Sequence, residues 1–74
     1  MDEEVLNLDG YENPDDVLAA VRYIRGEGRL LLRKYAKHKA RAMELRKQGQ
    51  ICDALWHEDV CHSIYLRLPE RMRW

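Results

Sequence analysis

The sequence predicts an all-α protein, and three features of it support this fold class. A run of mostly apolar positions has the strict 4-3 spacing of a helix that packs lengthwise against another helix. A helix-start signal precedes this run, and a glycine turn and a second apolar segment follow it. We therefore expect a long basic helix and a shorter antiparallel helix, joined as a helical hairpin. The nine positions of the run are Val17, Val21, Ile24, Gly28, Leu31, Tyr35, His38, Ala42 and Leu45.

The first helix has a clear start signal. Asn13 suits the N-cap, Pro14 suits the first helical position, and the two aspartates that follow complement the positive end of the helix dipole. Residues 1–12 carry acidic residues and an Asp9-Gly10 turn signal, so we expect them to form an acidic N-terminal arm. Residues 13–74 then form a single helical domain.

Two glycines interrupt the first helical segment. Gly26 and Gly28 together cost about 2 kcal/mol in a helix interior relative to alanine. The apolar phase is nevertheless kept across them, because Ile24 and Leu31 are seven residues apart. This favours a helix that continues to about residue 48, with at most a mild kink. The alternative is a break at 26–28, which gives helices 14–25 and 29–48 and a three-helix bundle.

The second helix is expected to run from Ile51 to about Leu68, since Gly49 suits a helix end and Pro69 stops the next one. Folding the chain about Gly49 brings Leu45 near Ala54, but the shorter helix reaches back only to about residue 31. An apolar stripe on the first helix is then left uncovered, and such a stripe indicates an interface. We expect a homodimer that associates through Val17, Val21, Ile24, Gly28 and Leu31.

The formal net charge of zero hides a segregation of charge along the chain. Residues 1–16 hold seven acidic residues and no lysine or arginine, whereas residues 22–47 hold ten basic and two acidic residues. This distribution indicates either an acidic partner or neutralisation by the N-terminal arm. Tryptophan and arginine are also the residues most common at binding hot spots. The candidate contacts with a partner or a nucleic acid are Arg29, Arg33, Lys34, Lys37, Arg41, Trp56 and Trp74.

Polar side chains within the hairpin predict a hydrogen-bonded layer rather than a catalytic or metal site. His38, Glu58 and His62 fall at similar heights on the two helices, where a polar layer fixes register. No nucleophile–base arrangement stands out, so we expect no enzyme activity and no cofactor. Cys52, His57, Cys61 and His62 cannot close a tetrahedron from one helix, so no metal ligand is predicted; a small metal-binding helical protein remains an alternative.

The C-terminal segment resembles the ends of small bacteriophage and prophage proteins. The shared pattern is H-E-x-x-C-x-x-I-Y-x-x-L-P-x-x-x-R-W, which here runs from His57 to Trp74. This resemblance implies an accessory protein that binds and modulates a host protein or nucleoprotein complex, with counter-defence such as CRISPR inhibition included. The alternative is a regulator that binds nucleic acid directly through the basic helix. No stretch approaches a membrane span, so we expect a cytoplasmic protein that does not enter a membrane.

Overall fold

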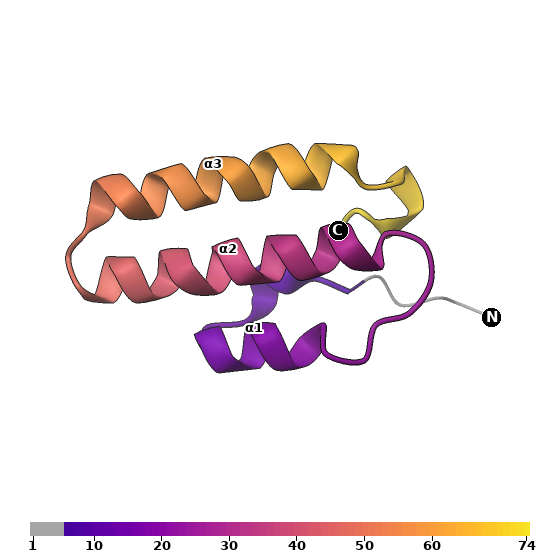
Figure 1. The fold of residues 1–74 in the computed structure, drawn as a ribbon, viewed down its shortest axis with the longest axis horizontal. Helices are drawn as coiled ribbons and strands as arrows, with labels where there is room; N and C mark the ends of the chain where they lie inside the picture. The colour runs from indigo at the N-terminus through magenta and orange to yellow at the C-terminus, as the bar shows by residue number, and fades with distance from the viewer. Residues whose placement is uncertain (1–5) are drawn as a thin grey trace.

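A computed structural model describes residues 6–74, and this part of the chain contains three α-helices and no strand (Figure 1). The central helix packs against both of the others, and each helix runs antiparallel to the one before it (Figure 1). The all-α prediction is therefore confirmed. The elements in chain order are η1 (Leu8–Gly10), α1 (Pro14–Ala20), α2 (Arg29–Lys47), α3 (Ile51–Arg67) and η2 (Glu70–Met72), where η marks a 3-10 helix.

The continuous first helix was a wrong prediction, and the alternative with a break at the glycines is the one that forms. The chain leaves α1 after Ala20 and enters α2 at Arg29. Gly26 and Gly28 have φ angles of +93° and +80°. This left-handed region costs about 1–2 kcal/mol for a residue with a Cβ atom, and it cannot continue a right-handed helix. The loop reverses the chain, so α1 lies back along α2.

The remaining helix boundaries agree with the local signals. The side chain of Asn13 accepts a hydrogen bond from the Asp15 backbone N–H at 2.9 Å, and Pro14 occupies the first turn of α1. Gly49 has a φ of +78° in the turn between α2 and α3. α3 ends at Arg67, just before Pro69. In the hairpin, Leu45 and Ala54 belong to one small buried cluster, as the expected register places them.

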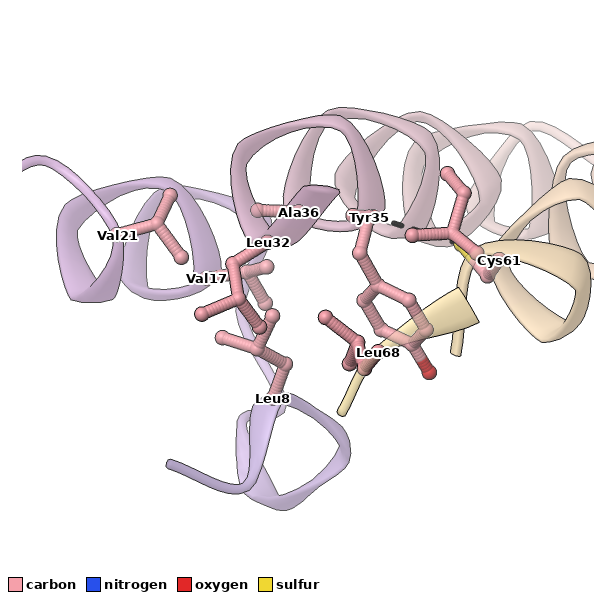
Figure 2. Packing of buried hydrophobic residues seen from close by; sticks show 9 residues of the cluster. Leu8, Val17, Val21, Leu32, Tyr35, Ala36, Cys61 and Leu68 are labelled. Atoms are coloured by element: carbon pink, nitrogen blue, oxygen red, sulfur yellow. Dashed lines mark hydrogen bonds between the residues drawn. The ribbon is translucent and has the colours of Figure 1, made fainter. Parts of the chain in front are cut away.

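The main core lies where the N-terminal segment, α1, α2 and the end of α3 meet (Figure 2). Leu8, Val17 and Leu68 are the largest side chains that are almost completely buried there. Leu32 and Tyr35 bring the inner face of α2 to the same cluster. A single core is therefore built from segments that are far apart in the sequence.

The expected self-association stripe is not left uncovered, and this prediction was wrong. Val17 and Val21 are only 0% and 4% exposed, because the folded-back α1 buries them against the same chain. Ile24 and Leu31 are partly buried and pack against the same core. A Cβ atom at Gly28 would lie 2.7 Å from the Met72 Cε atom, so the backbone of Gly28 packs closely against a side chain of the same chain. The stripe therefore no longer argues for a homodimer.

The described part of the N-terminal arm belongs to the core. Leu8 is 0% exposed, and Leu6 and Tyr11 pack around it. The Asn7 side chain accepts a hydrogen bond from the Asp9 backbone N–H at 3.0 Å, which fixes the η1 turn. Residues 1–5 of the predicted arm lie outside the described residues. Residues 6–12 are thus a structural part of the domain.

Truncating Leu8 tests whether the arm contributes to stability. Leu8→Ala is expected to lower the free energy of unfolding by about 2–5 kcal/mol, the usual cost of a large-to-small core substitution. Leu66→Ala is the matched control, because Leu66 is 55% exposed on α3, and it should change stability by no more than about 0.5 kcal/mol. Urea unfolding followed by circular dichroism measures both values, and equal values would contradict a docked arm.

Candidate binding surface

Four basic residues of α2 form a surface that faces away from the core. At about 100° per residue, Arg33, Lys34, Lys37 and Arg41 fall within roughly 100° of the helix circumference. Lys34, Lys37 and Arg41 are exposed and Arg33 is partly buried, whereas Leu32 and its neighbours on the opposite side of α2 are buried. We call these four residues the cationic face. The sequence predicted all four as contacts.

Three of the four residues of the cationic face have no ion-pair partner within residues 6–74, unlike Lys39 and Arg46 on the same helix. Lys39 pairs with Asp9 at 2.9 Å, and Arg46 forms a two-pronged ion pair with Glu58. Arg41 lies 3.4 Å from Glu44 in an exposed pair, which contributes little. Within residues 6–74, no carboxylate lies at ion-pair distance from the other three members of the face.

A groove between α1 and α2 borders the cationic face. It has a volume of about 300 Å³ and is lined by Leu18, Val21, Arg22, Arg33 and Lys37. The Arg33 guanidinium donates a hydrogen bond through Nη2 to the Arg22 carbonyl at 3.4 Å, so this side chain spans the two segments. The sequence did not predict Leu18 or Arg22 as site residues. Only the chain reversal at Gly26 and Gly28 places them beside α2.

The other predicted contacts lie at different places. Arg29 is exposed in the first turn of α2. Trp56 is 60% exposed on α3, with its ring centroid 4.9 Å from that of His57 and 6.0 Å from that of His38. His38 lies one helical turn after Lys34, at the edge of the cationic face. Trp56, which contacts His38, therefore borders this face on the side away from the groove.

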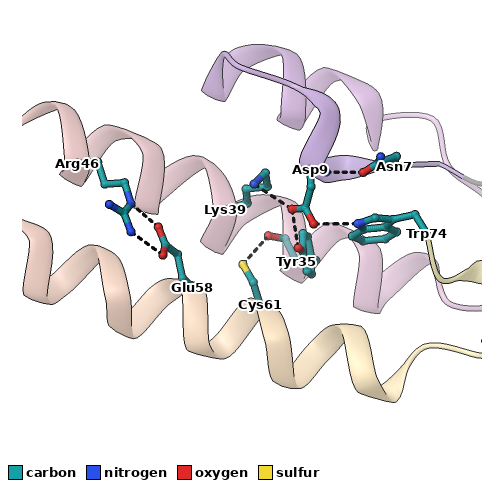
Figure 3. A network of polar contacts seen from close by, with 8 residues as sticks. All are labelled: Asn7, Asp9, Tyr35, Lys39, Arg46, Glu58, Cys61 and Trp74. Atoms are coloured by element: carbon teal, nitrogen blue, oxygen red, sulfur yellow. Dashed lines mark hydrogen bonds and ion pairs between the residues drawn. The ribbon is translucent and has the colours of Figure 1, made fainter.

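Trp74 is tied into the fold and is not presented as an exposed hook (Figure 3). Its ring makes edge contacts with Tyr35 and Tyr65, with centroids 5.0 and 4.8 Å apart. Its indole N–H donates to Asp9 at 2.8 Å, and the Tyr65 hydroxyl donates to the Trp74 carbonyl. Its polar groups are therefore already used within the chain.

Asp9 is the centre of this polar network. Its carboxylate accepts hydrogen bonds from the Tyr35 hydroxyl at 2.8 Å and from Trp74, and it pairs with Lys39. Burial alone would raise the pKa of Asp9, but the bonds from Trp74, Lys39 and Tyr35 outweigh it and hold the pKa below its ordinary value. Burial, together with the Asp9 carboxylate, raises the pKa of Tyr35. The network thus joins the arm, α2 and the C-terminal segment.

The predicted layer of His38, Glu58 and His62 does not form. His38 instead shares a hydrogen bond with His57, whose Nδ1 atom lies 2.8 Å from its own. Glu58 pairs with Arg46, which holds the pKa of this carboxyl below its ordinary value. His62 is exposed. The histidine pair between the two helices is therefore His38–His57, and His62 takes no part in it.

A larger cavity lies between the arm, α2 and α3, but most of its polar side chains already have hydrogen-bond or ion-pair partners within the chain. It has a volume of about 460 Å³, and its lining includes Asp9, Lys39, Glu58 and Cys61. The Cys61 thiol donates to the Tyr35 carbonyl at 3.4 Å, and burial raises its pKa to about 11. This thiol therefore stays protonated at neutral pH, in the form that is a weak nucleophile. In residues 6–74 no three His, Cys, Asp or Glu side chains gather as metal ligands do.

Comparisons with protein families, with curated proteins and with solved structures find no match to this chain. None of the helices in residues 6–74 combines the length and apolar character that crossing a bilayer requires. The binding surface is therefore interpreted from its own contacts and charges.

The Asp9 network predicts a loss of stability in acid. Because the folded state lowers the pKa of this group, its contribution is fully present above the ordinary value of 3.8 and is lost as pH falls through the folded pKa. Asp9→Asn should be less stable at neutral pH and should lose less stability between about pH 4 and pH 2. Urea unfolding across this range measures both. Asp59→Asn, at an exposed position, is the control and should keep the pH dependence of the unsubstituted protein.

The His38–His57 pair predicts a second pH dependence at higher pH. Burial lowers the pKa of His38, with the His57 ring and Lys34 adding to the effect. His38 in the unfolded chain therefore takes up a proton near pH 6.5, whereas His38 in the folded chain does not. The free energy of unfolding thus falls as pH decreases below about 6.5. His38→Gln should flatten this decline in thermal unfolding between pH 7 and pH 5. His62→Gln should leave the decline unchanged.

Proposed function

We propose that this protein acts by binding rather than by catalysis, and that its cationic face engages an acidic surface on a protein or nucleoprotein partner. One observation carries the proposal: three cations of the face have no carboxylate at ion-pair distance within residues 6–74, although Lys39 and Arg46 on the same helix do. Uncompensated charge of one sign steers a partner of opposite sign.

The surroundings of the face favour a protein partner over a nucleic acid. Leu30 is 63% exposed on the same side of α2, and Trp56 is 60% exposed on α3. Exposed apolar and aromatic side chains among arginines are typical of protein interfaces. The four cations span only about 12 Å of helix at 1.5 Å per residue. The chain also has a formal net charge of zero, whereas nucleic-acid-binding domains are commonly strongly basic.

The biological setting of the proposal comes from the C-terminal segment. Its resemblance to phage and prophage proteins supports an accessory role in which a host protein or nucleoprotein complex is bound and inhibited or redirected. Direct binding of nucleic acid is the alternative, favoured only by the number of exposed lysines and arginines on α2. The two functions differ in their response to nuclease and salt.

Charge reversal on the face tests the proposal. The immobilised protein captures partners from nuclease-treated bacterial lysate, and quantitative mass spectrometry compares it with the double variant Arg33→Glu/Lys37→Glu. We expect the partners enriched by the unsubstituted protein to fall at least about tenfold, because like charges then face the acidic surface. The control variant is Lys47→Glu/Arg67→Glu, which makes the same change of charge at exposed positions outside the face.

The control defines the contradicting result. Equal capture by the face variant and the control variant, with both shown to be folded by circular dichroism, would refute the proposal. Capture that disappears on nuclease treatment, together with DNA or RNA binding that weakens linearly on a log–log salt plot, would establish the nucleic-acid alternative instead.

A further inference from the structure

We propose that the groove between α1 and α2 is the anchor site of this surface, and that it receives an apolar side chain flanked by carboxylates in an acidic peptide segment of the partner. This inference rests on the proposed function and names the chemistry that the partner must present. The groove is the place where exposed apolar atoms and uncompensated cations meet on one concave surface.

The floor and rim of the groove are apolar. Val21 is 4% exposed and closes the bottom of the groove, while Leu18 is 39% exposed at its edge. Val21 has little surface left to cover, so the apolar surface that the groove still exposes is mainly that of Leu18. Burial of an apolar side chain against Leu18 removes apolar surface of both groups from water, which is worth about 25 cal/mol per Å².

The walls of the groove are cationic. Arg22 lies in the turn that follows α1, and Arg33 and Lys37 lie one turn apart on α2. The Arg33 guanidinium donates a long hydrogen bond to the Arg22 carbonyl at 3.4 Å, which directs this side chain across the groove. In the described chain, no ion-pair partner accompanies any of these three side chains. Three like charges around one cavity favour an anionic occupant.

The combination selects the chemistry of the occupant. A phosphate ion or a nucleic-acid backbone would use the three cations but leave Leu18 exposed to water. A purely apolar ligand would place desolvated cations beside apolar groups, which is costly. An apolar side chain between carboxylates satisfies both parts of the groove. Its volume of about 300 Å³ is at the lower end for ligand sites, which suits one large side chain.

Peptide titrations followed by nitrogen–proton NMR correlation spectra test the inference. The probes are acetyl-EELEE-amide and its serine counterpart acetyl-EESEE-amide, with inorganic phosphate and a short oligothymidylate as competitors of other chemistry. We expect saturable shifts confined to residues 18–22 and 33–37 with the leucine peptide, and a dissociation constant below about 1 mM. The serine peptide should bind at least about fivefold more weakly.

Matched variants separate the two parts of the groove. Leu18→Ser should reduce the leucine preference, whereas Leu66→Ser, at an exposed position on α3, should keep it. Arg33→Gln/Lys37→Gln should weaken both peptides by about tenfold, and Lys47→Gln/Arg67→Gln should leave them unchanged. Equal binding of the two peptides, shifts outside the groove, no saturable shift, or tighter binding of phosphate or oligothymidylate would each overturn the inference.

The two proposals fail in distinguishable ways. If lysate capture depends on the cationic face but the leucine peptide does not shift the groove, the anchor inference falls and the proposed function stands. If the peptide binds the groove but capture is the same in the face variant and its control, the proposed function falls.

Discussion

The left-handed conformations of Gly26 and Gly28 are the constraint on which the rest of the fold depends. They turn the chain back after α1, so Val17 and Val21 face the inner side of α2 rather than a second molecule. The same reversal places Arg22 beside Arg33 and so creates the groove. One local backbone requirement therefore determines both how the core is closed and which cations share a surface.

The closed core still needs the arm and the C-terminal segment. α1 has seven residues, which is too short for a helix to be stable without tertiary packing. Leu8 and Leu68 cover the end of the core where α1 and α2 meet (Figure 2). Asp9 then joins these outer segments through Tyr35, Lys39 and Trp74, as Figure 3 shows. In this small domain, the carboxylate of Asp9 in η1 thus links the N-terminal and C-terminal segments to α2.

The sequence predicted which residues are buried better than it predicted what buries them. The 4-3 spacing correctly marked Val17, Val21, Tyr35 and Leu45 as inward-facing. However, the spacing of apolar residues can be the same whether a helix continues or a loop interrupts it. It therefore could not reveal that α1 folds back along α2. Caps and turns that depend on neighbouring residues, such as those at Asn13 and Gly49, were predictable from local chemistry.

The candidate site shows the same division. Helical periodicity was enough to place Arg33, Lys34, Lys37 and Arg41 on one face, because one element carries all four. Pairings between elements depend on which side chains of the two helices face each other, and here the His38–His57 and Arg46–Glu58 contacts replace the expected layer. Leu18 and Arg22 could be predicted as site residues only if the two glycines were taken as a chain reversal, in spite of the apolar spacing that continues across them.

The fold also sorts the cations of α2 by direction. Those that point toward the arm or α3, Lys39 and Arg46, are neutralised by Asp9 and Glu58 and contribute to holding the segments together. Of the outward-pointing cations of the cationic face, Arg33, Lys34 and Lys37 have no ion-pair partner within residues 6–74, and Arg41 has only an exposed pair with Glu44. A net charge of zero is therefore compatible with a strongly cationic surface, since Asp9 and Glu58 neutralise other cations of α2 and the remaining acidic residues are distributed along the chain. The local charge that a partner meets is set by this sorting rather than by the total.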